Sequence, residues 1–451
     1  MASFFRRAFD RSYFILAPAV LLTYFVPLRM RVGNGMVAPF LALWFLWIFL
    51  KGERAPYYLS RKFMAAFIPL ALYYLLYAFL YGFHDWCGLT LQKTMLDGLL
   101  IVIYIYIFHY SVSRGKYKEL LFLNAIICFA LSYGSIAYAS FEVGSYRGQR
   151  LGVGGETIEQ TLNRLDRASS GVVNYGGIYG MMMMVVAMVR YYKFIPWKWR
   201  FVDLLLVAVF CFGIYRGAYS TATAVTVAGS IFVIFLNLIR IHDRKIHRLL
   251  IAFSVIFVIC VAYPSVLSPL SGLFGTAAEA FPPESDYAIR LQSIAEALQG
   301  YEDTYAVQRA DLYWGSLKTF CSHPIFGFRF YQLLFDENYQ AFIGGHSYFF
   351  DAFAATGLVL PTLLVVGLVN FFRYLKAIYS FAGLSVDLLS VWQCAFWTVV
   401  IVACINQLGQ FETHIIFYMM LPSIPFLNYK YHLRRNGYAG VRYFPANVPV
   451  V

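Results

Sequence analysis

Long apolar runs recur along the whole chain, and their length constrains the fold more than any other feature of the sequence. A helix needs about 17 to 25 mostly apolar residues to cross the hydrocarbon core of a bilayer. The sequence predicts about twelve such helices, near residues 13–28, 36–50, 63–82, 94–112, 119–141, 173–192, 201–215, 218–239, 249–268, 347–372, 390–409 and 413–428. We therefore expect an all-α polytopic integral membrane protein with about 12 transmembrane helices.

Composition gives no room for a separate soluble domain. Only 13% of the 451 residues are charged and 60% are hydrophobic, whereas soluble domains have about 25% charged residues. Residues 1–451 are therefore predicted to form a single transmembrane domain. The run at 13–28 follows a basic flank without a small-residue cleavage site, so we expect a first span rather than a removed signal.

The basic residues alternate between the connections and predict a topology. With the N-terminus inside, 24 of the 36 basic residues fall in predicted cytoplasmic segments, as the positive-inside rule requires. Both termini are then cytoplasmic, and the net charge of +13 is explained by topology and by contact with anionic membrane lipids. Because these charges are dispersed between spans, we expect no nucleic-acid partner.

This topology leaves a large external loop over residues 265–345. Structureless loops longer than about 15 residues are uncommon unless they are functional or disordered. Apolar residues in 287–301 repeat at three and four positions, which predicts an amphipathic helix, and 310–320 predicts a second one. The second helix should end at His323-Pro324, because proline stops a helix.

Arginines outside the predicted membrane are the candidate binding residues. Arg216 lies in a tight turn between two predicted spans, where an unpaired charge is usually functional. The alternative is that its side chain reaches the phosphates of membrane lipids. The other candidates are Arg147, Arg150, Arg290 and Arg309. A planar guanidinium suits phosphate or pyrophosphate better than an uncharged solute.

His346 immediately precedes the apolar run at 347–372 and is predicted to lie on the external side. An imidazole accepts a proton from a hydroxyl at neutral pH, although a structural role is the alternative. Asn174 and Tyr175 open the predicted sixth span and are candidates to contact a phosphate or sugar. No clustered external carboxylates and no cysteine spacing indicate a metal site, so we expect neither metal nor cofactor.

The runs QRADLYWGSLKTFCSHPIFGF and GGHSYFFDAFAATGLVLPTLL together resemble the characteristic segment of the O-antigen ligase and O-antigen polymerase superfamily of bacterial surface-polysaccharide enzymes. The matching positions are Arg309, Trp314, His323, Pro324, Gly327, His346 and Gly357. Arg216 before Gly217 and Ala218, and the segment from Arg147 to Gly155, look similar as well. Ser347 departs from the pattern, because the family usually has Asn there.

The resemblance implies a GT-C-like fold and a metal-independent glycosyltransferase in the bacterial inner membrane, with a periplasmic active site. Its donor would be a glycan linked to undecaprenyl pyrophosphate. Arg216 and Arg309 would hold the pyrophosphate, and His346 would activate the acceptor hydroxyl. Fixed guanidinium groups stabilise the charge that grows on the leaving oxygen, which removes the need for a metal.

Three functions remain open. A polymerase would transfer the glycan to a growing glycan, with a chain-length regulator as a further partner, and a ligase would transfer it to the lipid A core. The short segment between Pro324 and His346 favours the polymerase, because it leaves little room for a large core. A polytopic transporter is the alternative from another class, but we find no internal repeat and the polar residues gather at the external ends.

Overall fold

The computed structural model describes most of the chain, and within the described residues every regular element is a helix. Those residues are 13–25, 27–28, 34–51, 57–83, 91–140, 175–217, 220–238, 252, 268, 271–283, 286–299, 305–336, 339–408 and 411–435. The α-helices are α2 (Tyr13–Tyr24), α4 (Val37–Lys51), α5 (Tyr57–Phe83), α6 (Leu91–Ser113), α7 (Tyr117–Ala137), α9 (Tyr175–Tyr191), α10 (Trp197–Arg216), α11 (Ser220–Leu238), α13 (Ser271–Glu279), α14 (Asp286–Leu298), α15 (Tyr305–Ser322), α16 (Gly327–Leu334), α17 (Tyr348–Thr356), α18 (Val359–Phe381), α19 (Leu389–Ile405), α20 (Phe411–Ile415), α21 (Leu421–Ser423) and α22 (Tyr429–Arg435). The 3₁₀ turns are Asn34–Met36, Tyr138–Ser140, Val386–Leu388 and Ile424–Asn428, and a π-helical turn covers Ile416–Met420.

Six of the described helices are long and apolar enough to cross a membrane, namely Tyr57–Leu80, Thr94–Ser113, Tyr117–Ser140, Thr221–Leu238, Val359–Phe381 and Val386–Ile405. Three further apolar helices are shorter, namely Ile15–Tyr24, Val37–Ile48 and Gly176–Tyr191. The expected class, a helical membrane protein, agrees with this architecture. Among the residues that the structure describes, the count stays below the expected twelve spans, and most of the predicted span at 249–268 lies outside them.

α10 has the length of a span but begins with charged residues. It has 20 residues, and Lys198, Arg200 and Asp203 lie in its first two turns. The Arg200 guanidinium lies 5.0 Å from the centre of the Tyr192 ring, a favourable cation–π contact. Arginine and lysine near helix ends keep their charged groups at a membrane interface while their alkyl stems cover apolar surface. The charged start of α10 therefore suits an interfacial position.

The prediction of one continuous span over 347–372 is wrong, because the helix breaks at Gly357 into α17 and α18. Gly357 has φ of +63°, a conformation that glycine adopts at little cost. A Cβ at this position would lie 2.3 Å from the carbonyl oxygen of Ile325. The Leu358 N–H donates to the same carbonyl at 2.9 Å. The turn after α15 thus packs into the break, which only glycine permits.

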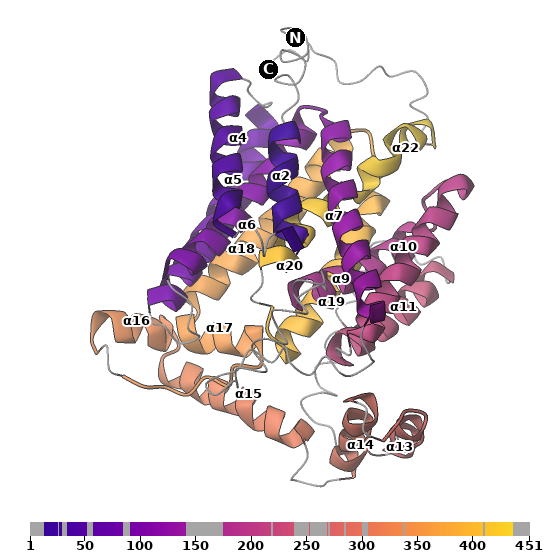
Figure 1. Cartoon of the computed structure of the whole chain (residues 1–451). Coiled ribbons are helices and arrows are strands. Elements are labelled where there is room, and N and C mark those ends of the chain that lie inside the picture. The colour runs from indigo at the N-terminus through magenta and orange to yellow at the C-terminus, as the bar shows by residue number, and fades with distance from the viewer. Residues whose placement is uncertain are drawn as a thin grey trace.

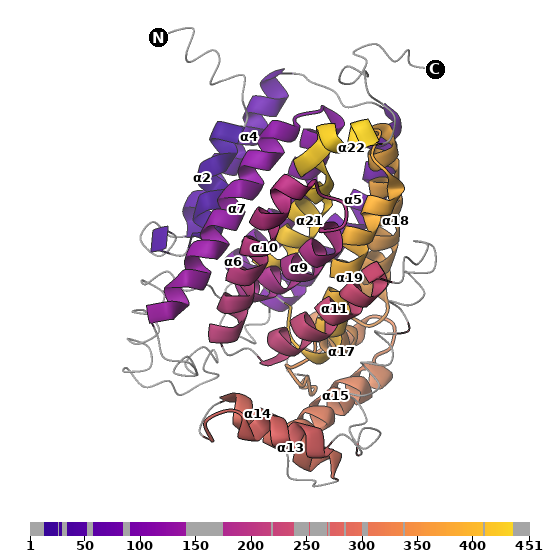
Figure 2. The same cartoon turned by 90° about the vertical axis from the view of Figure 1, so that its right-hand side faces the viewer.

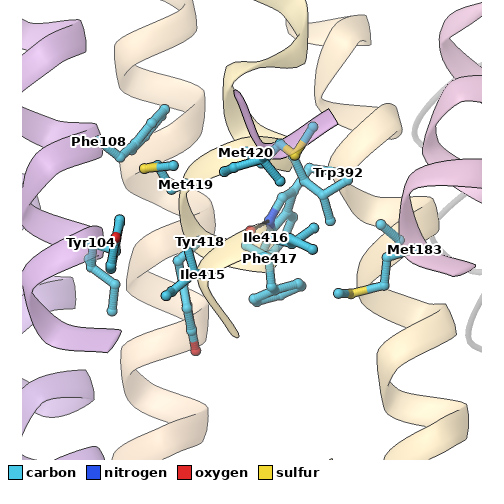
Figure 3. Close-up of a cluster of buried hydrophobic side chains, with 14 of the residues drawn as sticks. Tyr104, Phe108, Met183, Trp392, Ile415, Ile416, Phe417, Tyr418, Met419 and Met420 are labelled. Atoms are coloured by element: carbon cyan, nitrogen blue, oxygen red, sulfur yellow. Dashed lines mark hydrogen bonds between the residues drawn. The ribbon is translucent and has the colours of Figure 1, made fainter. Parts of the chain in front are cut away.

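The buried centre of the bundle surrounds the π-helical turn (Figure 3). Tyr104 and Phe108 approach it from α6, Met183 from α9 and Trp392 from α19 (Figure 3). The Trp392 indole N–H donates to the carbonyl of Phe417 at 3.2 Å. Aromatic rings, aliphatic side chains and methionines pack together here, so van der Waals contact joins the π-helical turn to α6, α9 and α19.

The predicted loop over 265–345 forms α13, α14, α15 and α16. The helices predicted over 287–301 and 310–320 are confirmed as α14 and α15, and α15 ends before His323-Pro324 as expected. Figures 1 and 2 show α13, α14 and α15 beyond one end of the bundle, with α22 at the opposite end. We name these the loop end and the α22 end.

Candidate functional site

His346 lies at the loop end, in a tight connection that leads into α17. Gly345 turns the chain with φ of +71°, and a Cβ on Gly344 would lie 2.4 Å from the carbonyl oxygen of Leu312 on α15. The Gly344 N–H also donates to the Ser316 hydroxyl at 2.9 Å. His346 itself is half-buried. The connection is therefore pressed against α15, and the backbone that carries the imidazole is held in place.

Ser347 fixes the start of α17. Its hydroxyl accepts the Phe350 N–H at 3.1 Å, which is an N-cap. The same hydroxyl donates to the carbonyl of Ala403 on α19 at 3.1 Å. Serine thus caps α17 at the position where the resembled family usually has Asn, and it also joins α17 to the end of α19.

Asp351 forms the polar centre of this arrangement. One carboxylate oxygen accepts the Ser316 hydroxyl at 2.7 Å. The other accepts the Ser347 N–H at 3.1 Å and the Gln407 side-chain amide at 2.5 Å. Burial raises the pKa of the Asp351 carboxyl to about 6, and hydrogen bonds from these donors and from the Gly345 N–H oppose the rise. A buried carboxylate therefore links α15, the His346 connection and the segment after α19.

Sequence reasoning assigned Asp351 no role. Its partners Ser316 and Gln407 lie 35 and 56 residues away in the chain. The available signal was an acidic side chain inside an apolar run next to a histidine. Such a residue is rarely buried unless it is hydrogen-bonded or paired, so its position alone indicated a polar partner.

A second imidazole lies near this site. The His414 ring on α20 is 6.2 Å from the Tyr348 ring and 5.2 Å from the Tyr74 ring, measured between centres. The hydroxyls of Tyr348 and Tyr73 are 2.6 Å apart. Tyr348 is only two residues beyond His346 in the chain. Tyrosines from α5 and α17 and the histidine of α20 therefore form one buried aromatic cluster next to the start of α17.

Arg216 is the last residue of α10 and is half-buried. Its guanidinium donates to the carbonyl of Tyr138 from Nη2 at 3.2 Å and from Nε at 3.4 Å, and to the carbonyl of Ala139 at 3.4 Å. These carbonyls follow the C-terminus of α7, where a positive charge is favourable. Arg216 thus has a structural role at the loop end, in addition to any role in binding.

α14 covers the end of α10 and brings Arg290 to the same end of the bundle. The Tyr287 hydroxyl donates to the carbonyl of Tyr215 at 2.8 Å, and the two rings stack with centres 5.7 Å apart. The same hydroxyl lies 3.3 Å from that of Thr223 on α11. Arg290 follows Tyr287 by three residues on α14 and is half-buried. One helical turn therefore separates it from the anchored tyrosine.

Arg309 lies on α15, one turn before Tyr313. The Tyr313 hydroxyl donates to the carbonyl of Ile405 at 2.8 Å, and its ring stacks on Phe350 of α17 at 5.8 Å. Ser316, which donates to Asp351, follows one turn later. The backbone of Arg309 is therefore placed by a helix that contacts both α17 and α19.

The remaining candidates divide into two groups. Arg147, Arg150 and Asn174 lie outside the described residues, and Tyr175 is the first residue of α9. Among the described residues, Arg216, Arg290, Arg309 and His346 all lie on elements of the loop end. A chain of contacts joins them, from α10 to α14 through Tyr287, from α14 to α15, and from α15 to α17 through Ser316.

The part of the chain that the structure describes contains no group of three His, Cys, Asp or Glu residues that could hold a metal ion. Neither a protein-family model nor a curated protein matches the sequence.

Proposed function

We propose that the protein is a membrane glycosyltransferase that moves an oligosaccharide from undecaprenyl pyrophosphate to an acceptor hydroxyl at the loop end. One observation carries the proposal. The connection with His346 is fixed through Ser316 and Asp351 against α15, the helix on which Arg309 lies. A histidine on a fixed connection beside an arginine-bearing helix suits transfer from a phosphate-linked donor to a hydroxyl.

In the proposed reaction, the acceptor hydroxyl attacks the anomeric carbon of the donor glycan. His346 accepts the hydroxyl proton as the new glycosidic bond forms. The bond between the anomeric carbon and the pyrophosphate oxygen breaks, and its electron pair leaves with the pyrophosphate. Guanidinium groups of Arg309 and Arg216 stabilise that growing negative charge. Arg290, together with Arg147, Arg150, Asn174 and Tyr175, would bind the rest of the donor or the acceptor.

The same proposal includes the finer features of the fold and location. The chain would have about twelve spans in a GT-C-like arrangement within the bacterial inner membrane. Both termini and the α22 end would face the cytoplasm, and the loop end would face the periplasm. The α22 end carries Arg114, Lys116, Arg373 and Lys376 near helix ends, which agrees with the positive-inside rule.

Among the acceptors, we propose a growing glycan, so that the enzyme is a polymerase of repeat units. Between Pro324 and His346, the described residues form α16, of eight residues, and short connections. This leaves little room to enclose a large phosphorylated acceptor such as the lipid A core.

The test is transfer in vitro with purified full-length protein and an undecaprenyl-pyrophosphate oligosaccharide. We expect products that grow by whole repeat units, with equal yield in the presence of a chelator. Transfer only when lipid A core is added would replace the polymerase with a ligase. The absence of transfer to either acceptor, from protein that remains folded, would refute a glycosyltransferase. Uptake of a solute by the same protein in vesicles would support the transporter instead.

A further inference from the structure

A groove lies between α5 and α18 at the α22 end, far along the bundle from the candidate site. It has a volume of about 590 Å³. Its lining residues are Tyr58, Lys62, Ala65, Asn370, Arg373, Lys376, Ala377, Ser380 and Phe381. The two helices pack side by side in opposite directions, since Asn370 contacts Ala65 while the earlier Gly367 lies against the later Leu70.

The described charged residues of this groove are all basic. Lys62, Arg373 and Lys376 line it, and among the described residues that line it there is no carboxylate. Asn370 and Ser380 add polar groups that can donate hydrogen bonds. Three cations that line one groove repel one another. An anion between them would offset this repulsion, so the groove suits a negatively charged ligand.

Contacts within the groove hold part of this set in place. The Asn370 amide donates to the carbonyl of Ala65 on α5 at 3.0 Å, and its oxygen accepts from the Arg373 guanidinium at 3.3 Å. The Lys62 ammonium lies 4.6 Å from the centre of the Tyr58 ring. Ala65 and Ala377 have the smallest side chains in the lining, which leaves the space between the cations unfilled.

The surface next to the groove is apolar and exposed. On α18, Val366 and Val369 precede Arg373 at helical spacing and are 43% and 46% exposed. On α5, Ile68 and Leu72 follow Ala65 and are 49% and 46% exposed. Both helices are among those long and apolar enough to cross a membrane. A ligand that fits this surface therefore carries a negative group at one end and apolar chains at the other.

We propose that this groove binds the phosphate headgroup of an anionic phospholipid, with the acyl chains lying along the exposed residues of α5 and α18. Basic pockets between membrane helices suit such headgroups, and each basic residue near the surface strengthens the attraction. A free phosphate would use the cations alone and would gain nothing from the apolar surface. The site is independent of the proposed glycosyl transfer, and its test does not depend on activity.

The experiment measures lipid binding to the full-length protein in detergent by native mass spectrometry, with phosphatidylglycerol, phosphatidylcholine and inorganic phosphate as the probes. The variant K62Q/R373Q/K376Q removes the three charges. We expect its affinity for phosphatidylglycerol to fall about a hundredfold. The matched control K118Q/K193Q/K198Q removes three cations near helix ends away from the groove and should change the affinity less than about threefold.

A second variant separates the groove from general surface charge. Ala65→Trp keeps every cation but fills the space between them, so it should also abolish preferential binding of phosphatidylglycerol. Ala65 is exposed, so the larger side chain should not disturb the core. Three results would each overturn the proposal. The control triple variant could lose as much affinity as K62Q/R373Q/K376Q, or the unaltered protein could bind phosphatidylcholine as well as phosphatidylglycerol. The third is a response to inorganic phosphate as strong as that to the lipid.

Discussion

The Ser316 hydroxyl on α15 donates a hydrogen bond of 2.7 Å to the carboxylate of Asp351 on α17. This bond joins a helix of the predicted external loop to the short helix that follows His346. Both side chains are buried, so the pair is shielded from water. Hydrogen bonds to a buried charged group are stronger than those between neutral groups and are costly to lose. The position of His346 therefore depends on residues that need not touch a substrate.

Ser316→Ala should weaken both stability and activity. It removes the donor to Asp351 and leaves the Gly344 N–H without its acceptor, at a cost of about 1–3 kcal/mol. Thermal unfolding in detergent and glycan transfer should both decline. Ser322→Ala is the matched control, since that exposed hydroxyl on α15 bonds only its own helix, at the carbonyl of Lys318. If Ser316→Ala behaves like this control, the proposed connection to His346 is wrong.

The raised pKa of Asp351 predicts a pH dependence of stability. The carboxyl titrates at about 6 in the fold and at about 3.9 in an unfolded chain. Between these values the folded state binds more protons than the unfolded state, so the free energy of unfolding falls as pH rises from about 4 to about 6. The total loss is about 3 kcal/mol, and it changes no further above that range.

The measurement compares the unfolding midpoint of the unaltered protein with that of Asp351→Asn across this range. The variant should be less stable over the whole pH range. The asparagine NH₂ group would face the donors that now bond the carboxylate, and its one carbonyl oxygen could accept only some of their hydrogen bonds. Its stability should also lack the decline contributed by the carboxyl. An identical slope in both proteins would show that another group titrates there.

Periodicity made the helices of the loop predictable. In α14 and α15 the apolar residues repeat at helical spacing, and Pro324 marks the end of the second helix. These signals are local, so they can be read from a single sequence without knowledge of the fold. The sequence does not mark the ends of the spans in this way, and α5 begins at Tyr57, six residues before the predicted start at 63.

The break at Gly357 and the role of Asp351 depend on contacts between distant parts of the chain. A glycine in an apolar run is compatible with a continuous helix. The need for glycine at 357 comes from the carbonyl of Ile325, which occupies the place that a side chain would take. Likewise the partners of Asp351 come from α15 and from the segment after α19. Sequence spacing cannot reveal which distant donors meet a carboxylate, so this part of the candidate site needed the structure.

His346→Ala and Arg309→Ala test the two central roles of the proposed reaction. Loss of the base should reduce transfer by about 10²–10⁴-fold, and loss of an electrostatic donor by about 10²–10³-fold. Both proteins should insert and accumulate normally. Lys318→Ala, an exposed cation on the same helix as Arg309, should retain full activity. Normal glycan length from either central variant would refute the role given to that residue.

Gly357→Ala tests the geometry that separates α17 from α18. An alanine would have to adopt φ of +63° and would place its Cβ 2.3 Å from the carbonyl oxygen of Ile325. Strain of this kind costs about 1–3 kcal/mol, so the unfolding midpoint should fall. Gly275→Ala on α13 is the control, because nothing lies within 4 Å of its Cβ and alanine favours a helix by up to about 1 kcal/mol. A midpoint that stays unchanged in Gly357→Ala would mean that the two helices can join without the turn after α15 between them.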